Sequence, residues 1–194
     1  DRRPAPLILG HEAAGVVASG PESGRRVTIN PLVSCGVCRL CKSGRDNLCL
    51  SRQIISMPPR EGSFAERISM PTSNLVTVPD GVPLWQSALT EPMACGWHAV
   101  RLARENLPMA EADIAAVVLG GGAIGVGSAL SLAAQGISNV TVVEPNTVRR
   151  ERLLKDLSQF KILASSDEAE QGAFDLIVDA VGYAATREAA CALA

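Results

Sequence analysis

The chain has 194 residues, of which 47% are hydrophobic and 20% charged, so it can form one large or two small packed domains. The 18 basic and 20 acidic residues give a net charge of −2, and no lysine or arginine cluster exceeds a pair, which argues against nucleic acid as a partner. No apolar run reaches the ~18 residues of a membrane span, and the first residues lack a signal-peptide pattern. We therefore expect a cytoplasmic protein without a membrane partner.

The first ninety residues contain most of the prolines, many short apolar runs and little helical periodicity. This pattern predicts a small β-rich, barrel-like domain. The predicted strands cover residues 16–17, 26–30, 64–69 and 75–78.

Four cysteines lie within fifteen residues, at Cys35, Cys38, Cys41 and Cys49. The C-x₂-C-x₂-C-x₇-C spacing lets one loop surround a tetrahedral zinc ion, and four thiolates leave no open position for a substrate. We therefore predict a structural zinc site. Two disulfides or an iron–sulfur cluster are the alternatives. Disulfides are disfavoured because the thiols of a protein without an export signal stay reduced.

Strand and helix patterns alternate regularly in residues 91–194. Thr90 is expected to cap a first helix, with Glu91 in its first turn. Strands are then predicted at 113–119, up to 144, at 161–163 and at 174–179, with helices at 123–135 and up to 157, and a last helix from 184. This alternation predicts about four strands of a doubly wound parallel sheet, where a complete dinucleotide-binding fold has six.

A glycine turn follows the first of these strands, with the pattern Gly120-x-Gly122-x-x-Gly125. Gly120 permits the tight turn, Gly122 permits close approach of a pyrophosphate, and Gly125 permits close packing of the next helix. The N–H groups at the helix start, at Ala123 and Ile124, would then face the phosphates. An ordinary turn rich in small residues is the alternative.

An acidic residue at the end of the next strand strengthens the dinucleotide interpretation. Glu144 lies 19 residues beyond Gly125, where a carboxylate would bind the ribose 2′-hydroxyl. Such a carboxylate accepts NAD and repels the 2′-phosphate of NADP. Val181 follows the fourth strand at the same edge of the sheet and is a further candidate for cofactor contact.

Five motifs in this order resemble the zinc-dependent medium-chain alcohol dehydrogenases. They are the Gly-His-Glu motif at 10–12, the four-cysteine segment, Gly-Ser-Phe-Ala-Glu at 62–66, Glu91-Pro92 and the glycine turn. The resemblance covers essentially the whole chain, and it is closest to the polyol (sorbitol) and threonine dehydrogenase branch. It implies a GroES-like β-barrel catalytic domain at 1–90 and an NAD-binding Rossmann domain, here incomplete, at 91–194.

The resemblance also implies a catalytic zinc site. His11 corresponds to a zinc ligand, Glu12 to a ligand or its hydrogen-bonded partner, and Glu91 stands where classical members carry a zinc-binding cysteine. Helix capping is the alternative for Glu91. Arg149 corresponds to a residue that reaches the ribose and its neighbouring phosphate in relatives. The family's first zinc ligand and proton-relay hydroxyl lie upstream of Gly-His-Glu, so we expect the chain to be truncated at both ends.

We therefore predict a zinc-dependent oxidoreductase that transfers a hydride between a secondary alcohol or polyol and NAD. It would use one structural and one catalytic zinc, and its complete form is expected to be a homo-oligomer. A zinc-stabilised nucleotide-binding module without catalytic activity is the alternative.

Overall fold

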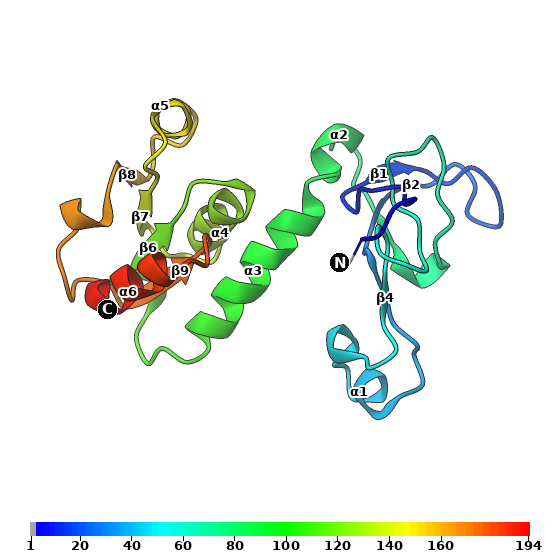
Figure 1. Cartoon of the computed structure of the whole chain (residues 1–194), viewed down its shortest axis with the longest axis horizontal. Coiled ribbons are helices and arrows are strands. Elements are labelled where there is room, and N and C mark those ends of the chain that lie inside the picture. The colour runs from blue at the N-terminus through cyan, green and yellow to red at the C-terminus, as the bar shows by residue number, and fades with distance from the viewer. Residues whose placement is uncertain (1–2) are drawn as a thin grey trace. The chain divides into compact units, whose positions relative to one another are not determined.

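The computed structural model of the chain describes residues 3–194 and divides the chain into two compact units, Asp1–Glu91 and Pro92–Ala194. The first unit contains small antiparallel sheets, and the second contains a parallel sheet with helices (Figure 1). Among the described residues, no helix combines the length and the apolar character needed to cross a bilayer.

The first unit is built on a three-stranded antiparallel sheet in the order β1-β2-β5. Its strands are β1 (Ala14–Val16), β2 (Arg26–Ile29) and β5 (Leu75–Thr77). A two-stranded sheet pairs β3 (Leu32–Val33) with β4 (Gln53–Ile54). The short helices are α1 (Arg39–Lys42), η1 (Asp46–Leu48), η2 (Thr72–Asn74) and α2 (Leu84–Ser87).

Asn74 connects the two sheets of the first unit. This buried side chain donates from Nδ2 to the carbonyls of Asn30 and Leu32, each at 2.8 Å. The amide thereby gives a hydrogen-bond donor to one carbonyl in the turn after β2 and to the first carbonyl of β3.

Two predictions are wrong in this part of the chain, the strand at 64–69 and the helix cap at Thr90. Residues 64–69 form no strand, because no strand ladder includes them. The Phe64 N–H bonds to the Leu9 carbonyl outside any ladder, and the Phe64 side chain is 77% exposed, so the segment lacks the alternately buried face of a strand. Thr90 does not cap the next helix. It is already helical, and its hydroxyl donates to the Ser87 carbonyl at 2.7 Å.

The second unit contains a four-stranded parallel sheet in the order β8-β7-β6-β9. Its strands are β6 (Ala115–Leu119), β7 (Asn139–Val143), β8 (Lys161–Leu163) and β9 (Leu176–Asp179). The helices are α3 (Thr90–Arg104), α4 (Ala123–Ala134), α5 (Thr147–Asp156) and α6 (Ala184–Leu193), with short turns η3 (Glu111–Asp113) and η4 (Ser166–Glu168).

Both faces of this sheet are packed. Successive side chains of a strand point to opposite faces, so Ala116 and Val118 join one cluster with α3, α4 and α5. Val117 and Leu119 join a second cluster, to which α6 contributes Leu193. This packing on two sides explains why every residue of β6 after Ala115 and of β7 after Asn139 is buried.

Helices α3 and α4 approach closely at a glycine. A Cβ atom at Gly96 would lie 2.6 Å from the backbone nitrogen of Ser128 and 2.7 Å from the carbonyl carbon of Gly127. Only glycine therefore permits this helix spacing, because main-chain atoms cannot move aside as a flexible side chain can.

We expect Gly96→Ala to lower the free energy of unfolding by about 1–3 kcal/mol, as overpacking does. Helix propensity alone would make the alanine variant more stable by about 1 kcal/mol. The sign of the change in the free energy of unfolding therefore distinguishes overpacking from helix propensity. Thermal unfolding of the variant measures the effect. Ala99→Gly, at an exposed position of the same helix, calibrates the propensity, and a more stable Gly96→Ala variant would contradict the packing argument.

Candidate functional site

The glycine turn connects β6 to α4 in the second unit. Gly120 has φ of +97°, a conformation that favours glycine, and Gly122 is the N-cap of α4. A Cβ at Gly125 would overlap the Gly120 carbonyl, so the third glycine lets the helix pack against the turn. The first N–H groups of α4, which include Ala123 and Ile124, cannot be bonded within the helix and form a ready-made site for an anion.

Glu144 follows β7 beside this turn. Its carboxylate is buried and accepts the N–H of Gly121 at 2.9 Å and the N–H of Asn146 at 2.8 Å. Nη1 of Arg149 lies 3.6 Å from Oε2 of the same carboxylate, while the Arg149 side chain is 63% exposed. The structure thus brings Glu144 and Arg149 together at the glycine turn.

Asp179 ends β9 on the other side of β6 and organises the turn that carries Val181. Its Oδ1 accepts the N–H groups of Val181 and Gly182, and its Oδ2 accepts the Thr186 hydroxyl at 3.0 Å. Partial burial alone would raise the pKa of Asp179, but these donors and the charge of Arg187 outweigh burial and lower it.

Val181 contacts the glycine turn from this side. A Cβ at Gly120 would lie 2.6 Å from Cγ2 of Val181. Two roles were not predicted from the sequence, that of Asp179 as the acceptor for its own turn and that of Gly121 as a position that requires glycine. The second depends on contacts with Leu153 and Glu144, which are distant in the sequence. The only local signal was the Asp-x-Val-Gly turn at 179–182.

The four predicted cysteines lie together in the first unit. One ligand atom from each lies within 4.8 Å of the others. The sulfurs of Cys35 and Cys41 are 3.9 Å apart, and those of Cys38 and Cys41 are 3.5 Å apart. These distances bracket the edge of about 3.8 Å that four Zn–S bonds of about 2.3 Å give a tetrahedron. The sulfur positions therefore fit one zinc ion.

Backbone donors favour thiolate at two of these cysteines. The Cys41 N–H lowers the pKa of Cys38 to about 6, and the Val37 and Cys38 N–H groups lower the pKa of Cys35. Burial and the hydrogen bond with Cys38 raise the pKa of Cys41 to about 12. The metal-free set therefore retains protons that zinc binding releases.

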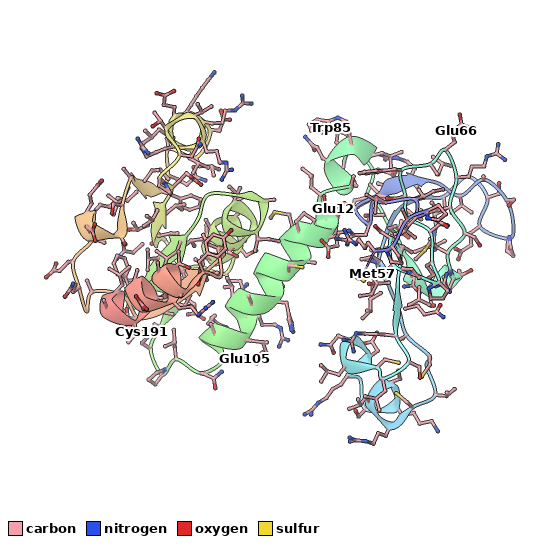
Figure 2. All side chains as sticks on the ribbon, viewed as in Figure 1. Glu12, Met57, Glu66, Trp85, Glu105 and Cys191 are labelled. Carbon is pink, nitrogen blue, oxygen red and sulfur yellow. The ribbon has the colours of Figure 1, made fainter. Side chains whose placement is uncertain are left out.

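His11, Glu12 and Glu91 form a second group in the first unit, with one ligand atom from each lying within 4.8 Å of the others. Nε2 of His11 is 3.9 Å from Oε2 of Glu91, and both side chains are partly buried. Glu12 is exposed and is labelled in Figure 2.

The backbone on both sides of His11 is fixed. Gly10 precedes it with φ of +96°, and a Cβ there would lie 2.6 Å from the Phe64 ring. After it, the Ala13 carbonyl accepts the Thr28 hydroxyl at 3.0 Å and the Ile29 N–H at 3.3 Å. The edge of the three-stranded sheet therefore positions the histidine and the adjacent glutamate.

Comparison with known proteins identifies the family. Residues 1–80 match the model of the alcohol dehydrogenase GroES-like domain. L-Idonate 5-dehydrogenase of Vitis vinifera is 32% identical over 167 residues, and sorbitol dehydrogenase of Bacillus subtilis (strain 168) is 34% identical over 156 residues. The chain belongs to the zinc-dependent medium-chain alcohol dehydrogenases. The resemblance predicted from the motifs is thus confirmed.

A solved structure extends the family match over both units. A candidate zinc-binding dehydrogenase from Sinorhizobium meliloti 1021, solved with NADP bound, aligns with a TM-score of 0.82 at 27% identity and covers 96% of this chain. The predicted fold class, a GroES-like domain followed by part of a Rossmann sheet, is confirmed. The chain spans 44% and 43% of the two curated dehydrogenases and 58% of the solved chain.

We expect Asp179→Asn to destabilise the chain by about 1 kcal/mol near neutral pH, because it weakens charge-assisted hydrogen bonds. The pKa of Asp179 is lower in the folded chain than in the unfolded chain. Its contribution is therefore complete above pH about 4 and is lost as pH falls through the folded pKa.

Denaturant unfolding between pH 7 and pH 2.5 measures this difference, which should shrink at the acidic end. Asp80→Asn, at an exposed turn of the first unit, is the matched control for removal of one carboxylate. A difference between wild type and Asp179→Asn that stays constant with pH would contradict the assignment.

Proposed function

We propose that the protein containing this chain is a zinc-dependent dehydrogenase that transfers a hydride between a secondary alcohol or polyol and NAD. The convergence of His11, Glu12 and Glu91 supports this most strongly, because a catalytic zinc takes nitrogen and oxygen ligands and keeps a position open for substrate. The names of the two curated relatives, an idonate and a sorbitol dehydrogenase, support a polyhydroxylated substrate.

The three side chains fit a zinc ion in type and spacing. Ligand atoms of a tetrahedral zinc lie roughly 3.4 Å apart, given Zn–N and Zn–O bonds of about 2.0–2.2 Å. Nε2 of His11 and Oε2 of Glu91 are 3.9 Å apart, and a small rotation of either side chain would bring them to this separation. A bound zinc would polarise the alcohol oxygen and ease loss of its proton.

Each of the three residues has a distinct proposed role. His11 would bind through a ring nitrogen as the neutral imidazole, oriented by the fixed backbone around Gly10 and Ala13. Glu12 would be a direct ligand, and Glu91 would hold the metal or its water. Exchange between the two carboxylates would open the position that the alcohol occupies.

The second unit would bind the dinucleotide. We propose residues 91–194 as the NAD-binding domain and residues 1–90 as the catalytic domain. The N–H groups at Ala123 and Ile124 would receive the phosphates between Gly122 and Gly125, and the nicotinamide cofactor would accept the hydride. Val181 would line the cofactor beside Gly120, and Glu144 and Arg149 would face the adenosine ribose.

The number of zinc ions per chain tests each of the two metal sites separately. We expect two zinc ions per chain in the wild type and one in each of Cys38→Ser and His11→Ala, measured by elemental mass spectrometry. Cys38→Ser should also lower the unfolding temperature, by about 2–4 °C for each kcal/mol lost, because structural zinc is coupled to folding. In the complete protein, His11→Ala should abolish turnover and Glu91→Ala should reduce it.

Cys191→Ser is the control for cysteine loss, since Cys191 is exposed on α6 and outside the four-cysteine set (Figure 2). One zinc per wild-type chain, held only by the cysteines, would favour the non-catalytic nucleotide-binding module. Retention of both metals and of turnover by His11→Ala would rule out the proposed catalytic site.

We expect NAD to bind more tightly than NADP, because the Glu144 carboxylate repels a 2′-phosphate. Arg149→Ala should widen this preference by roughly twofold to fivefold, since an exposed arginine offsets part of that repulsion. Calorimetric titration with both dinucleotides measures the ratio. Arg152→Ala, on the same helix and 79% exposed, is the control. Equal or tighter binding of NADP by the wild type would contradict the assignment.

A further inference from the structure

Glu144 is almost completely buried although its side chain is a carboxylate. The residue is 2% exposed, and its two carboxylate oxygens accept N–H groups from two different turns. Gly121 lies in the glycine turn after β6, and Asn146 lies in the turn after β7. One carboxylate therefore connects two β–α turns that are adjacent in the sheet.

Each of these turns is part of a larger constraint. Asn146 is the N-cap of α5, and its Oδ1 accepts the Arg149 N–H at 3.0 Å. At Gly121, a Cβ would lie 2.5 Å from Cδ1 of Leu153 on α5 and 3.1 Å from Oε2 of Glu144. The glycine turn thus rests directly on α5, with the carboxylate between the two turns.

Burial of a carboxylate is costly unless the charge is paired and hydrogen-bonded. Glu144 has two backbone donors and the Arg149 guanidinium 3.6 Å away. The fold therefore supplies hydrogen bonds and a positive charge to this carboxylate before any ribose is bound. Little of the carboxylate remains accessible for a ligand hydroxyl in this conformation.

We propose that Glu144 is a positioning residue that holds the glycine turn in the shape that receives the dinucleotide phosphates, whether or not it also contacts the ribose. The proposal rests on the proposed function of the second unit. Because Gly121 N–H is already bonded, the donors left for phosphate are those at the start of α4. A turn fixed before binding loses less conformational freedom when the ligand arrives, which increases affinity.

Two nucleotides that differ only at the ribose test the proposal on the 194-residue chain. ADP carries the 2′-hydroxyl and 2′-deoxy-ADP lacks it, while both carry the pyrophosphate. We expect Glu144→Gln and Glu144→Ala to weaken 2′-deoxy-ADP binding roughly tenfold, as expected for one lost charge-assisted hydrogen bond, and ADP binding by at least as much. Unchanged 2′-deoxy-ADP affinity, whatever happens to ADP, would overturn the proposal.

A measurement without nucleotide separates this result from failure of the proposed function. In Glu144→Gln the amide nitrogen replaces one acceptor oxygen, so one of the two backbone N–H groups loses its partner. We expect the amide proton resonance of Gly121 or Asn146 to move upfield and its exchange with solvent to accelerate, with little change at α6. Unchanged Gly121 and Asn146 signals would overturn the proposal even if nucleotide binding were absent in the wild type.

Glu151→Gln is the matched control, because it makes the same chemical change at an exposed position of α5. It should leave both affinities and both amide signals unaltered. A loss of both affinities in this control, equal to that in Glu144→Gln, would show a general effect of charge and contradict the positioning role.

Discussion

Close approach of main chains at glycine residues determines the position of the residues that we assign to chemistry. In the second unit, Gly125 lies against the Gly120 carbonyl, and Gly96 brings α3 against the backbone of α4. In the first unit, a Cβ at Gly62 would overlap the Leu9 carbonyl, beside Gly10 and the histidine that follows. Side chains cannot relieve these contacts, because the neighbouring atoms belong to the backbone. The turns that carry His11 and the phosphate-facing N–H groups therefore have little freedom to shift.

Carboxylates at the ends of β7 and β9 complement this backbone packing. Glu144 and Asp179 lie on opposite sides of β6, and each accepts two backbone N–H groups. Glu144 accepts one from its own turn and one from the turn after β6, whereas Asp179 accepts both from its own turn. Parallel strands place their following turns at one edge of the sheet, where N–H groups have no ladder partner. Acidic side chains at these positions satisfy the donors while the edge stays open for a ligand.

The second unit was largely predictable from sequence, and the first only in part. β6 is a continuous apolar run and β7 is largely one, so both could be predicted with ends within one or two residues of those found, and the regular alternation of strands and helices placed β8 at 161–163. The first unit has strands of two to four residues, too short for a periodic signal, and residues 64–69 were wrongly predicted as a strand.

The cysteine set was predictable because spacing alone brings its members together. By contrast, no periodicity connects His11 with Glu91, and only the family resemblance paired them. The inward orientation of Glu144 depends on Gly121, a contact between separate strands that sequence patterns do not contain.

The two candidate metal groups differ in how much of the chain must be ordered before they exist. Cys35 and Cys49 are 14 positions apart, whereas His11 and Glu91 are 80 apart. Closing the longer loop costs about 1.5 kcal/mol more in chain entropy, and it also requires the intervening strands to be in place. The cysteine group therefore needs only its own short loop to be ordered. The histidine–glutamate group requires β1, β2 and the start of α3 to be in place, so in the proposed two-zinc protein its metal site would depend on far more ordered chain than the cysteine site.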